Sequence, residues 1–114
     1  MRILSKEFVR KFANKIINVH PSLLPAFAGG MDLSVHEKVI ESGVKITGCT
    51  VHLVDESVDA GPILEQAAVR VEENETPESL KKKVQELEKQ CLVRVVKNFG
   101  EKKLFIEGKR AWFE

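Results

Sequence analysis

The sequence predicts an α/β fold, that is, a mixed β-sheet with flanking helices. Runs rich in Val, Ile and Thr, which favour strands, alternate with segments of helical periodicity along the 114 residues. Prolines, glycines and polar residues separate these segments. Because strands that alternate with helices are typical of α/β proteins, we expect some parallel pairing within the sheet.

The strands are predicted from β-branched runs. They are expected at residues 15–19, 44–54 and 63–71. Near the C-terminus, Leu104–Ile106 and Ala111–Phe113 flank a short polar segment that contains Gly108, which predicts a β-hairpin. The run Ile16–Val19 reads as a buried parallel strand, and such a strand needs neighbours on both sides.

Capping signals place the first two helices. Ser5 is predicted to cap a short helix that extends to Phe12. Ser34, with a glutamate three residues later, resembles a capping box, and Gly43 suits the position just after a helix end. A second helix is therefore expected from about residue 34 to 42.

A third, longer helix follows the last central strand. Thr76-Pro77-Glu78 combines a hydroxyl cap, a proline at the first position and an acid in the first turn. The helix is expected to reach Asn98 and to end at Gly100. Its apolar residues recur at helical spacing and are predicted to face the core; they are Leu80, Val84, Leu87, Cys91 and Val95.

Composition excludes several classes of function. The chain has 18 Lys and Arg against 17 Asp and Glu, so the excess of basic residues that drives nucleic-acid binding is missing. No apolar run approaches the roughly 20 residues of a membrane span, and the first residues do not form a secretory signal. We therefore expect a cytoplasmic protein without nucleic-acid or membrane partners. Cys49 and Cys91 are then expected to be reduced packing residues, and three dispersed histidines predict no metal site.

The segment Ile17–Pro25, with the sequence INVHPSLLP, carries the clearest chemical signal. Residues two apart in a strand face the same side, so Asn18 and His20 should project together, and Pro21 should end the strand there. An amide can donate a hydrogen bond to a developing oxyanion, and an imidazole can do the same or move a proton. The pair suits a reaction in which a carbonyl carbon becomes tetrahedral.

A carboxylate would complete this set. Asp59 lies in a loop that follows a strand and could orient the imidazole or accept protons through water, although an Asp before Ala-Gly-Pro also suits a plain turn. His52 could be a partner of Asp59, but a buried, hydrogen-bonded strand histidine is the favoured reading. His36 is placed on a surface helix and is given no role.

The sequence resembles the C-terminal part of the phosphoribosylglycinamide formyltransferases. The resemblance is carried by residues 1–5, 17–25, 48–54 and 55–62 and fades after about Glu88. Asn-x-His with a later Asp-x-Gly-Pro loop marks the wider formyltransferase group. The Pro21 that follows the histidine points to the glycinamide ribonucleotide enzymes, because relatives acting on methionyl-tRNA usually carry Gly there and formyltetrahydrofolate deformylases another His.

The resemblance implies a formyltransferase-type mixed sheet and the transfer of formyl from 10-formyltetrahydrofolate to the amine of glycinamide ribonucleotide in purine biosynthesis. It implies Asn18, His20 and Asp59 as catalytic residues. The implied folate-binding residues are Met1, Arg2, Ile3, Leu4, Asn18, Asp55, Glu56, Ser57, Val58 and Asp59. The implied nucleotide-binding residues are Gln85, Glu86, Leu87 and Glu88, although Leu87 and Lys89 depart from the residues usual in the family.

The resemblance also bears on domain organisation. It makes residues 1–114 the C-terminal folate-binding and catalytic portion of a Rossmann-like domain whose N-terminal nucleotide-binding half is absent. The alternative is a truncated, non-catalytic remnant that binds folate weakly or self-associates. Either way, an exposed sheet edge would favour a homo-oligomer or a complementing N-terminal half as partner.

Overall fold

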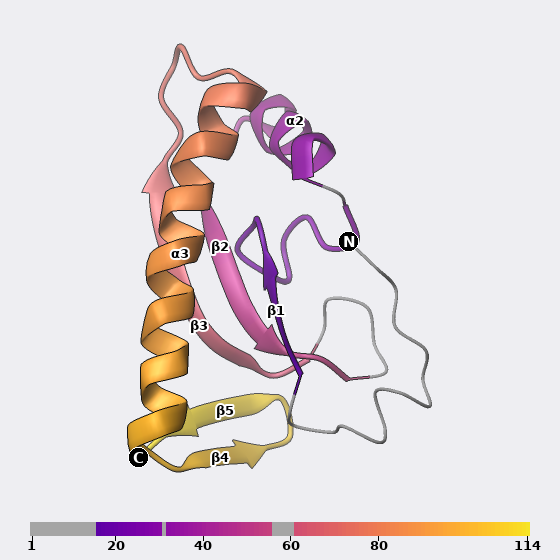
Figure 1. Ribbon diagram of the computed structural model, residues 1–114. Coiled ribbons are helices and arrows are strands. Elements are labelled where there is room, and N and C mark those ends of the chain that lie inside the picture. Colours follow the sequence, from indigo (N-terminus) through magenta and orange to yellow (C-terminus); the bar gives the residue numbers. More distant parts are fainter. Residues whose placement is uncertain (1–15, 31, 56–60) are drawn as a thin grey trace.

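The described part of the chain folds into a five-stranded mixed sheet with two helices (Figure 1). The computed structural model describes residues 16–30, 32–55 and 61–114. In chain order the elements are β1 (Ile17–His20), α2 (Asp32–Ser42), β2 (Ile46–Leu53), β3 (Ile63–Arg70), α3 (Pro77–Glu101), β4 (Leu104–Glu107) and β5 (Arg110–Phe113). The α/β class and the positions of these strands agree with the sequence-based prediction. The helix predicted over residues 5–12 lies outside the described residues.

The strands are ordered β1-β2-β3-β5-β4. Among the five described strands, β3 and β5 pair in parallel, and the other neighbouring pairs are antiparallel. The expectation of a parallel strand at residues 16–19 is therefore not met by its described pairing. Within the described part of the chain β1 has β2 as its single neighbour, with an antiparallel register. Strand β1 thus lies at the edge of the described sheet.

Helix α2 begins earlier than its predicted cap. It starts at Asp32, so Ser34 lies inside the helix and is exposed. The other end agrees with the prediction, because Gly43 has a φ of 76° and its amide donates to the Ile40 carbonyl. His36 was placed on the surface by its sequence context, and this was wrong: it is buried, 1% exposed.

Helix α3 begins as predicted. The Thr76 side chain accepts from the Ser79 amide while the Ser79 hydroxyl accepts from the Thr76 amide, and Pro77 occupies the first turn. The predicted end at Gly100 was wrong, since the helix continues to Glu101 and the Lys102 amide donates to Asn98. One glycine costs only about 1 kcal/mol in a helix, which is too little to stop it.

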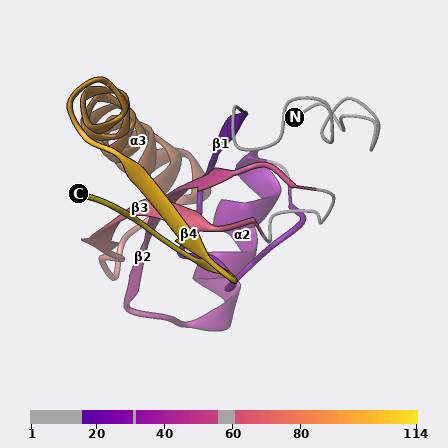
Figure 2. The same cartoon turned by 90° about the horizontal axis from the view of Figure 1, so that it is seen from below.

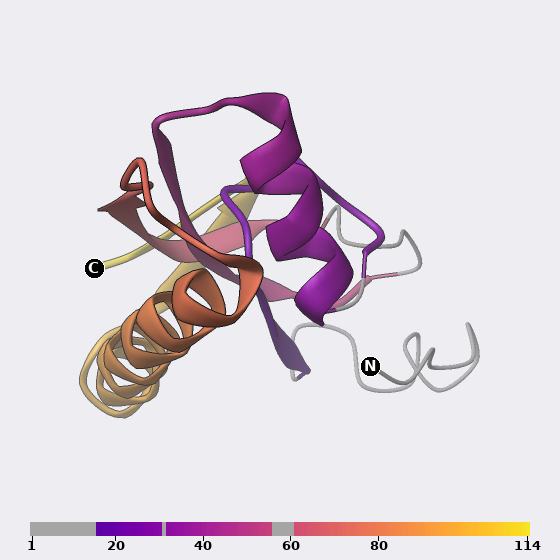
Figure 3. The ribbon, with the colours of Figure 1, turned by 90° about the horizontal axis from the view of Figure 1, so that it is seen from above.

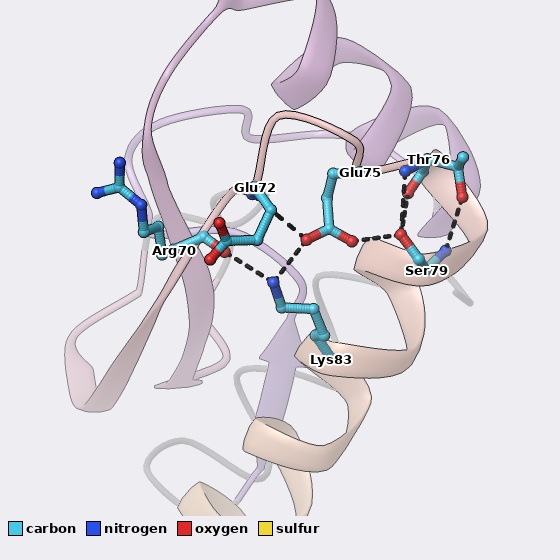
Figure 4. A network of polar contacts seen from close by, with 6 residues as sticks. All are labelled: Arg70, Glu72, Glu75, Thr76, Ser79 and Lys83. Atoms are coloured by element: carbon cyan, nitrogen blue, oxygen red, sulfur yellow. Dashed lines mark hydrogen bonds and ion pairs between the residues drawn. The ribbon is translucent and has the colours of Figure 1, made fainter.

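A charged network joins the start of α3 to the end of β3 (Figure 4). The Lys83 ammonium donates to the Arg70 carbonyl at 2.9 Å and to the Glu75 carboxylate at 2.5 Å. Glu75 also accepts from the Ser79 hydroxyl and from the Glu72 amide. Burial disfavours the charged carboxylate, but these hydrogen bonds outweigh it and lower the pKa of Glu75 below its ordinary value.

Both helices contribute to one hydrophobic core. In Figure 3, α3 is seen nearly end-on with α2 beside it, and Figure 2 shows the β4–β5 hairpin from the opposite end. The fully buried cluster joins α2, β2 and α3; its members are Val35, Val39, Cys49, Val51, Leu80, Val84, Cys91 and Val95. Leu87 is half-buried against this cluster, so the predicted apolar stripe of α3 is confirmed. We call the side of β1–β3 that carries Cys49 and Val51 the helix face.

The opposite side of β1–β3 carries polar residues and is called the polar face below. Strand β2 alternates between the two faces, because residues two apart point the same way. Cys49 and Val51 point to the helix face, whereas Thr50 and His52 point to the polar face. None of the described helices combines the length and apolar character that a bilayer span requires.

Candidate functional site

The polar face collects the residues that the sequence singled out. In the β1–β2 register Asn18 lies opposite His52, and His20 lies opposite Thr50. Thr50 in turn lies opposite Gln66 of β3. Cross-strand partners share a face of the sheet, so Asn18 and His20 project together as predicted. The site is therefore a block of polar side chains across three adjacent strands.

The imidazole of His20 is held by the loop that follows its own strand. His20 is buried, 1% exposed, and its Nε2 atom lies 3.0 Å from the carbonyl oxygen of Phe27. A carbonyl oxygen can only accept a hydrogen bond, so Nε2 carries the proton in the neutral ring. The other nitrogen, Nδ1, then holds the lone pair that can take a proton or accept a hydrogen bond.

The loop from Pro21 to Phe27 is folded against β2. The Thr50 hydroxyl donates to the Ser22 carbonyl at 2.7 Å and accepts from the Leu24 amide at 3.0 Å. The Ser22 hydroxyl donates to the Ala26 carbonyl at 2.6 Å, and the Ala26 amide donates to Leu23, which closes a turn. The loop is thus held by hydrogen bonds to β2 and by hydrogen bonds within the loop itself.

A second contact to this loop comes from β3. The side-chain amide of Gln66 donates to the Leu24 carbonyl at 3.1 Å and to the Thr50 hydroxyl at 3.0 Å. The sequence-based prediction assigned no role to Thr50 or Gln66. The available signal was that each is a polar residue on the polar face of its strand. Such a pattern predicts which face of the sheet a residue is on, but not its partner on the neighbouring strand.

The two remaining polar residues of the block differ in exposure. Asn18 is half-buried, so its amide is within reach of a ligand at the sheet edge. His52 is buried, 2% exposed, and its Nδ1 atom lies 2.9 Å from the Leu53 carbonyl. This geometry agrees with the favoured reading of His52 as a buried, hydrogen-bonded strand histidine. Its predicted alternative partner, Asp59, lies outside the described residues.

The predicted folate loop can be described only at its two ends. Asp55 is exposed, whereas Glu56–Asp59 and Met1–Leu4 fall outside the described residues. The Leu53 amide donates to the Pro62 carbonyl at 2.9 Å, which joins the chain before the loop to the chain after it. Gly61 packs against this junction, and a Cβ atom there would collide with the Leu53 carbonyl.

The predicted nucleotide-binding residues lie on α3. Gln85 and Glu88 line a cavity of about 400 Å³, together with Val19, Lys89 and Leu92. Val19 lies between Asn18 and His20 in β1 but is paired with Val51 on the helix face, so this cavity lies on the side of the sheet opposite to the candidate catalytic pair. The two other predicted residues differ: Glu86 is exposed, and Leu87 packs against the core.

This arrangement suits acyl chemistry at a carbonyl carbon. An amide donor and an imidazole with a fixed tautomer share one face of the sheet, where they can bind an oxyanion and transfer a proton. Among residues 16–30, 32–55 and 61–114, no three His, Cys, Asp or Glu side chains are grouped closely enough to hold a metal ion.

Comparison with known proteins gives relatives of two activities. The chain is 53% identical over 88 residues, 77% of its length, to the trifunctional purine biosynthetic protein adenosine-3 of Gallus gallus. It is 39% identical over 110 residues, 96% of its length, to the formyltetrahydrofolate deformylase of Escherichia coli (strain K12). The crystal structure of phosphoribosylglycinamide formyltransferase from Anaplasma phagocytophilum superposes with a TM-score of 0.90 over 97% of this chain at 42% identity.

These relatives are all longer than the chain. It spans 8% of the Gallus gallus protein, 38% of the Escherichia coli deformylase and 53% of the Anaplasma phagocytophilum chain. The model of the family described as formyl transferase matches residues 1–96, which include both Asn18 and His20. The chain therefore belongs to the formyl transferase family.

Proposed function

We propose that this chain carries the catalytic part of a folate-dependent formyltransferase of purine biosynthesis. The reaction moves formyl from 10-formyltetrahydrofolate to the amine of glycinamide ribonucleotide. The observation that carries the proposal is the juxtaposition of Asn18 and His20 on the polar face, with the His20 ring fixed by the Phe27 carbonyl. Pro21 after the histidine supports the ribonucleotide as acceptor.

Each residue has a distinct task in this reaction. The substrate amine attacks the formyl carbon, and the formyl oxygen gains negative charge. The Asn18 side chain donates a hydrogen bond to that oxygen, and the His20 imidazole transfers a proton. Asp59 receives the proton that leaves the amine, through water. The C–N bond to the folate then breaks, and the folate nitrogen takes up the proton that the amine released, delivered by the His20 imidazole.

Binding of the two substrates is assigned to separate segments. Met1–Leu4 and Asp55–Asp59, with Asn18, are proposed to bind the folate. Gln85–Glu88 are proposed to approach the ribonucleotide; Gln85 and Glu88 line a cavity with Val19, the residue between Asn18 and His20. Lys89 also lines this cavity and adds a cation where an anionic substrate would lie.

The proposed domain assignment concerns the part that would anchor the substrate phosphate. We assign residues 1–114 to the C-terminal folate-binding and catalytic portion, and the nucleotide-binding half to another polypeptide segment. Exposed apolar side chains support a covering partner; on α3 they include Leu92, Val93, Val96 and Phe99. Correct anchoring is important because positioning of two reactants can contribute about 7–11 kcal/mol to lowering a barrier.

A deformylase is the second candidate. In that reaction water replaces the amine, and formate is the product. The observation in its favour is that the match to the Escherichia coli deformylase extends over 110 residues, further along this chain than the match to the Gallus gallus protein. Both reactions need the same oxyanion donor and proton carrier, so the acceptor distinguishes them.

The test supplies 10-formyltetrahydrofolate to the chain, alone and mixed with a separately produced N-terminal half of a family relative. Glycinamide ribonucleotide is added to one set of assays and left out of the other. Formylated ribonucleotide in the assays that contain it supports the proposal. Formate released without that amine supports the deformylase. If neither product forms but calorimetry detects saturable binding of a folate analogue, the chain is a non-catalytic remnant.

A further inference from the structure

We infer that Gln66 is a positioning residue for His20, although the two side chains do not touch each other in any described contact. The inference deepens the proposed function and rests on it for the meaning of the His20 imidazole. Gln66 lies on β3, two strands away from His20. Its side-chain amide holds the loop that in turn holds the imidazole.

The first step is the identity of the Gln66 donor. The Gln66 nitrogen contacts the Leu24 carbonyl, which can only accept, so the atom facing it must be the amide nitrogen. The second proton of the same nitrogen goes to the Thr50 hydroxyl. One side chain therefore satisfies a loop carbonyl and a buried strand hydroxyl together.

The second step is the state of Thr50. This hydroxyl, fully buried, accepts from Gln66 and from the Leu24 amide and donates its single proton to the Ser22 carbonyl. A hydroxyl has one proton and two lone pairs, so all of its capacity is used. The Leu24 amide and the Ser22 carbonyl set the direction in which Thr50 donates, Gln66 fills its remaining lone pair, and both ends of the Ser22–Leu24 segment are held.

The third step connects this segment to the imidazole. From Leu24 the chain makes a turn closed by Ser22 and Ala26 and reaches Phe27, whose carbonyl accepts from His20 Nε2. Phe27 has a φ of 57°, a left-handed conformation that bulky residues rarely adopt. Such a conformation persists where its surroundings hold it. The Phe27 side chain packs against the hydrophobic core, and the loop that leads to it is held by Thr50 and Gln66.

The consequence is chemical as well as structural. While the Phe27 carbonyl is in place, the neutral imidazole keeps its proton on Nε2 and its lone pair on Nδ1. If the loop shifts, the Phe27 carbonyl no longer favours the proton on Nε2, and the share of the Nδ1–H tautomer rises. A residue that merely stabilised the fold would alter the stability of the chain without altering the tautomer of His20.

The test is an NMR measurement on the full chain with ¹⁵N-labelled histidine, at alkaline pH, where imidazoles are neutral. The His20 signals are identified as those that disappear in His20→Gln. In the unmodified chain His20 is expected to show only the Nε2–H tautomer. In Gln66→Glu, which has almost the same shape but no donor, a second set of His20 resonances from the Nδ1–H tautomer is expected.

Two further variants sharpen the measurement. Arg70→Gln is the matched control, since Arg70 is exposed on the same face of β3 and the substitution changes the net charge by the same amount as Gln66→Glu. It is expected to keep the single tautomer. Gln66→Lys restores a donor at similar reach and is expected to return His20 to the Nε2–H form.

A folded Gln66→Glu chain that keeps the single Nε2–H tautomer would overturn the inference, as would an Nδ1–H tautomer in the unmodified chain. If Gln66→Glu does not fold, Gln66→Met removes the donor without adding charge, and the same criterion applies. The spectra need no substrate. A tautomer change in a protein that lacks formyl transfer would therefore support the positioning role while contradicting the proposed function.

Discussion

Both faces of the β1–β3 sheet hold fully buried side chains, but these are buried by different means. On the helix face, Cys49 and Val51 are fully buried among aliphatic side chains of α2 and α3. On the polar face, His20, Thr50 and His52 are at most 2% exposed, and the described contacts around them are hydrogen bonds to backbone carbonyls, amides and other side chains. Burial alone therefore does not separate a core from a site. The difference is that packing tolerates a change of shape poorly, whereas the polar face tolerates a change of hydrogen-bonding capacity poorly.

The largest expected effect is on catalysis and comes from the polar face. His20→Ala removes the proposed proton carrier and should lower the rate of formyl transfer about a hundredfold to ten-thousandfold in the assembled enzyme. The measurement is kcat for formylated ribonucleotide at saturating substrates. Arg70→Gln provides the control variant, and an unchanged rate in His20→Ala would show that the catalytic assignment is wrong.

The largest expected effect on stability comes from the helix face. Leu80 is fully buried in α3, so Leu80→Ala should lower the free energy of unfolding by roughly 2–5 kcal/mol through lost burial and a residual cavity. Urea titration measures the change. Val93 lies on the same helix but is 67% exposed, and Val93→Ala should stay within about 0.5 kcal/mol. Equal effects at the two positions would contradict this description of the core.

A smaller loss of stability is expected when the polar face keeps its shape but loses a hydroxyl. Thr50→Val preserves volume and leaves the Leu24 amide and the Ser22 carbonyl without their partner. The expected cost is about 1–3 kcal/mol in the free energy of unfolding, because buried polar groups then lack hydrogen bonds. A variant as stable as the parent in urea would mean that water or a shifted loop replaces the hydroxyl.

A pH-dependent effect is expected at Glu75, outside both faces. Burial works against the charged form, but hydrogen bonds from Lys83, Ser79 and the Glu72 amide lower the pKa of Glu75. A lowered pKa in the folded state stabilises the fold above the carboxyl's unfolded pKa, and this contribution is lost as pH falls through the folded value. Glu75→Gln should therefore be less stable than the parent at neutral pH, by up to about 1 kcal/mol, and nearly equal to it in acid. Unfolding curves at both pH values test this, and a difference that persists in acid would refute it.

The smallest expected effect concerns the two core cysteines, whose thiols should not react with an alkylating agent in the folded chain. Burial, followed by the hydrogen bond to Cys91, raises the pKa of the Cys49 thiol to about 12. The two sulfurs lie 3.6 Å apart, and both cysteines are free and buried. Since the thiolate is the reactive form, iodoacetamide should leave the folded chain unmodified and should alkylate both residues after unfolding. Rapid alkylation of the native chain, detected by mass spectrometry, would indicate an open core.

The sequence predicted the outline of the two faces better than their connections. Alternation along the strand correctly predicted that Asn18 and His20 face the same side of the sheet. Helical spacing correctly predicted that Leu80 and Val84 lie in the core. Gln66 was missed because its partner Leu24 is 42 residues away in the chain, and only the folded register brings them together. His36 was misplaced because one polar residue on a short helix carries no sign of what packs above it.

The assigned residues of the loop after β2 remain predictions, because Glu56–Asp59 lie outside the described residues. The junction at the base of that loop has a consequence for how the protein can change over generations. Gly61 is the position where any side chain would push apart the Leu53 and Pro62 backbones. In a library that replaces each residue in turn, we expect position 61 to be almost empty of viable variants. The other residues of the loop could then change during evolution while Gly61 stays the same. The chemistry of the loop could vary, but its attachment to the sheet could not.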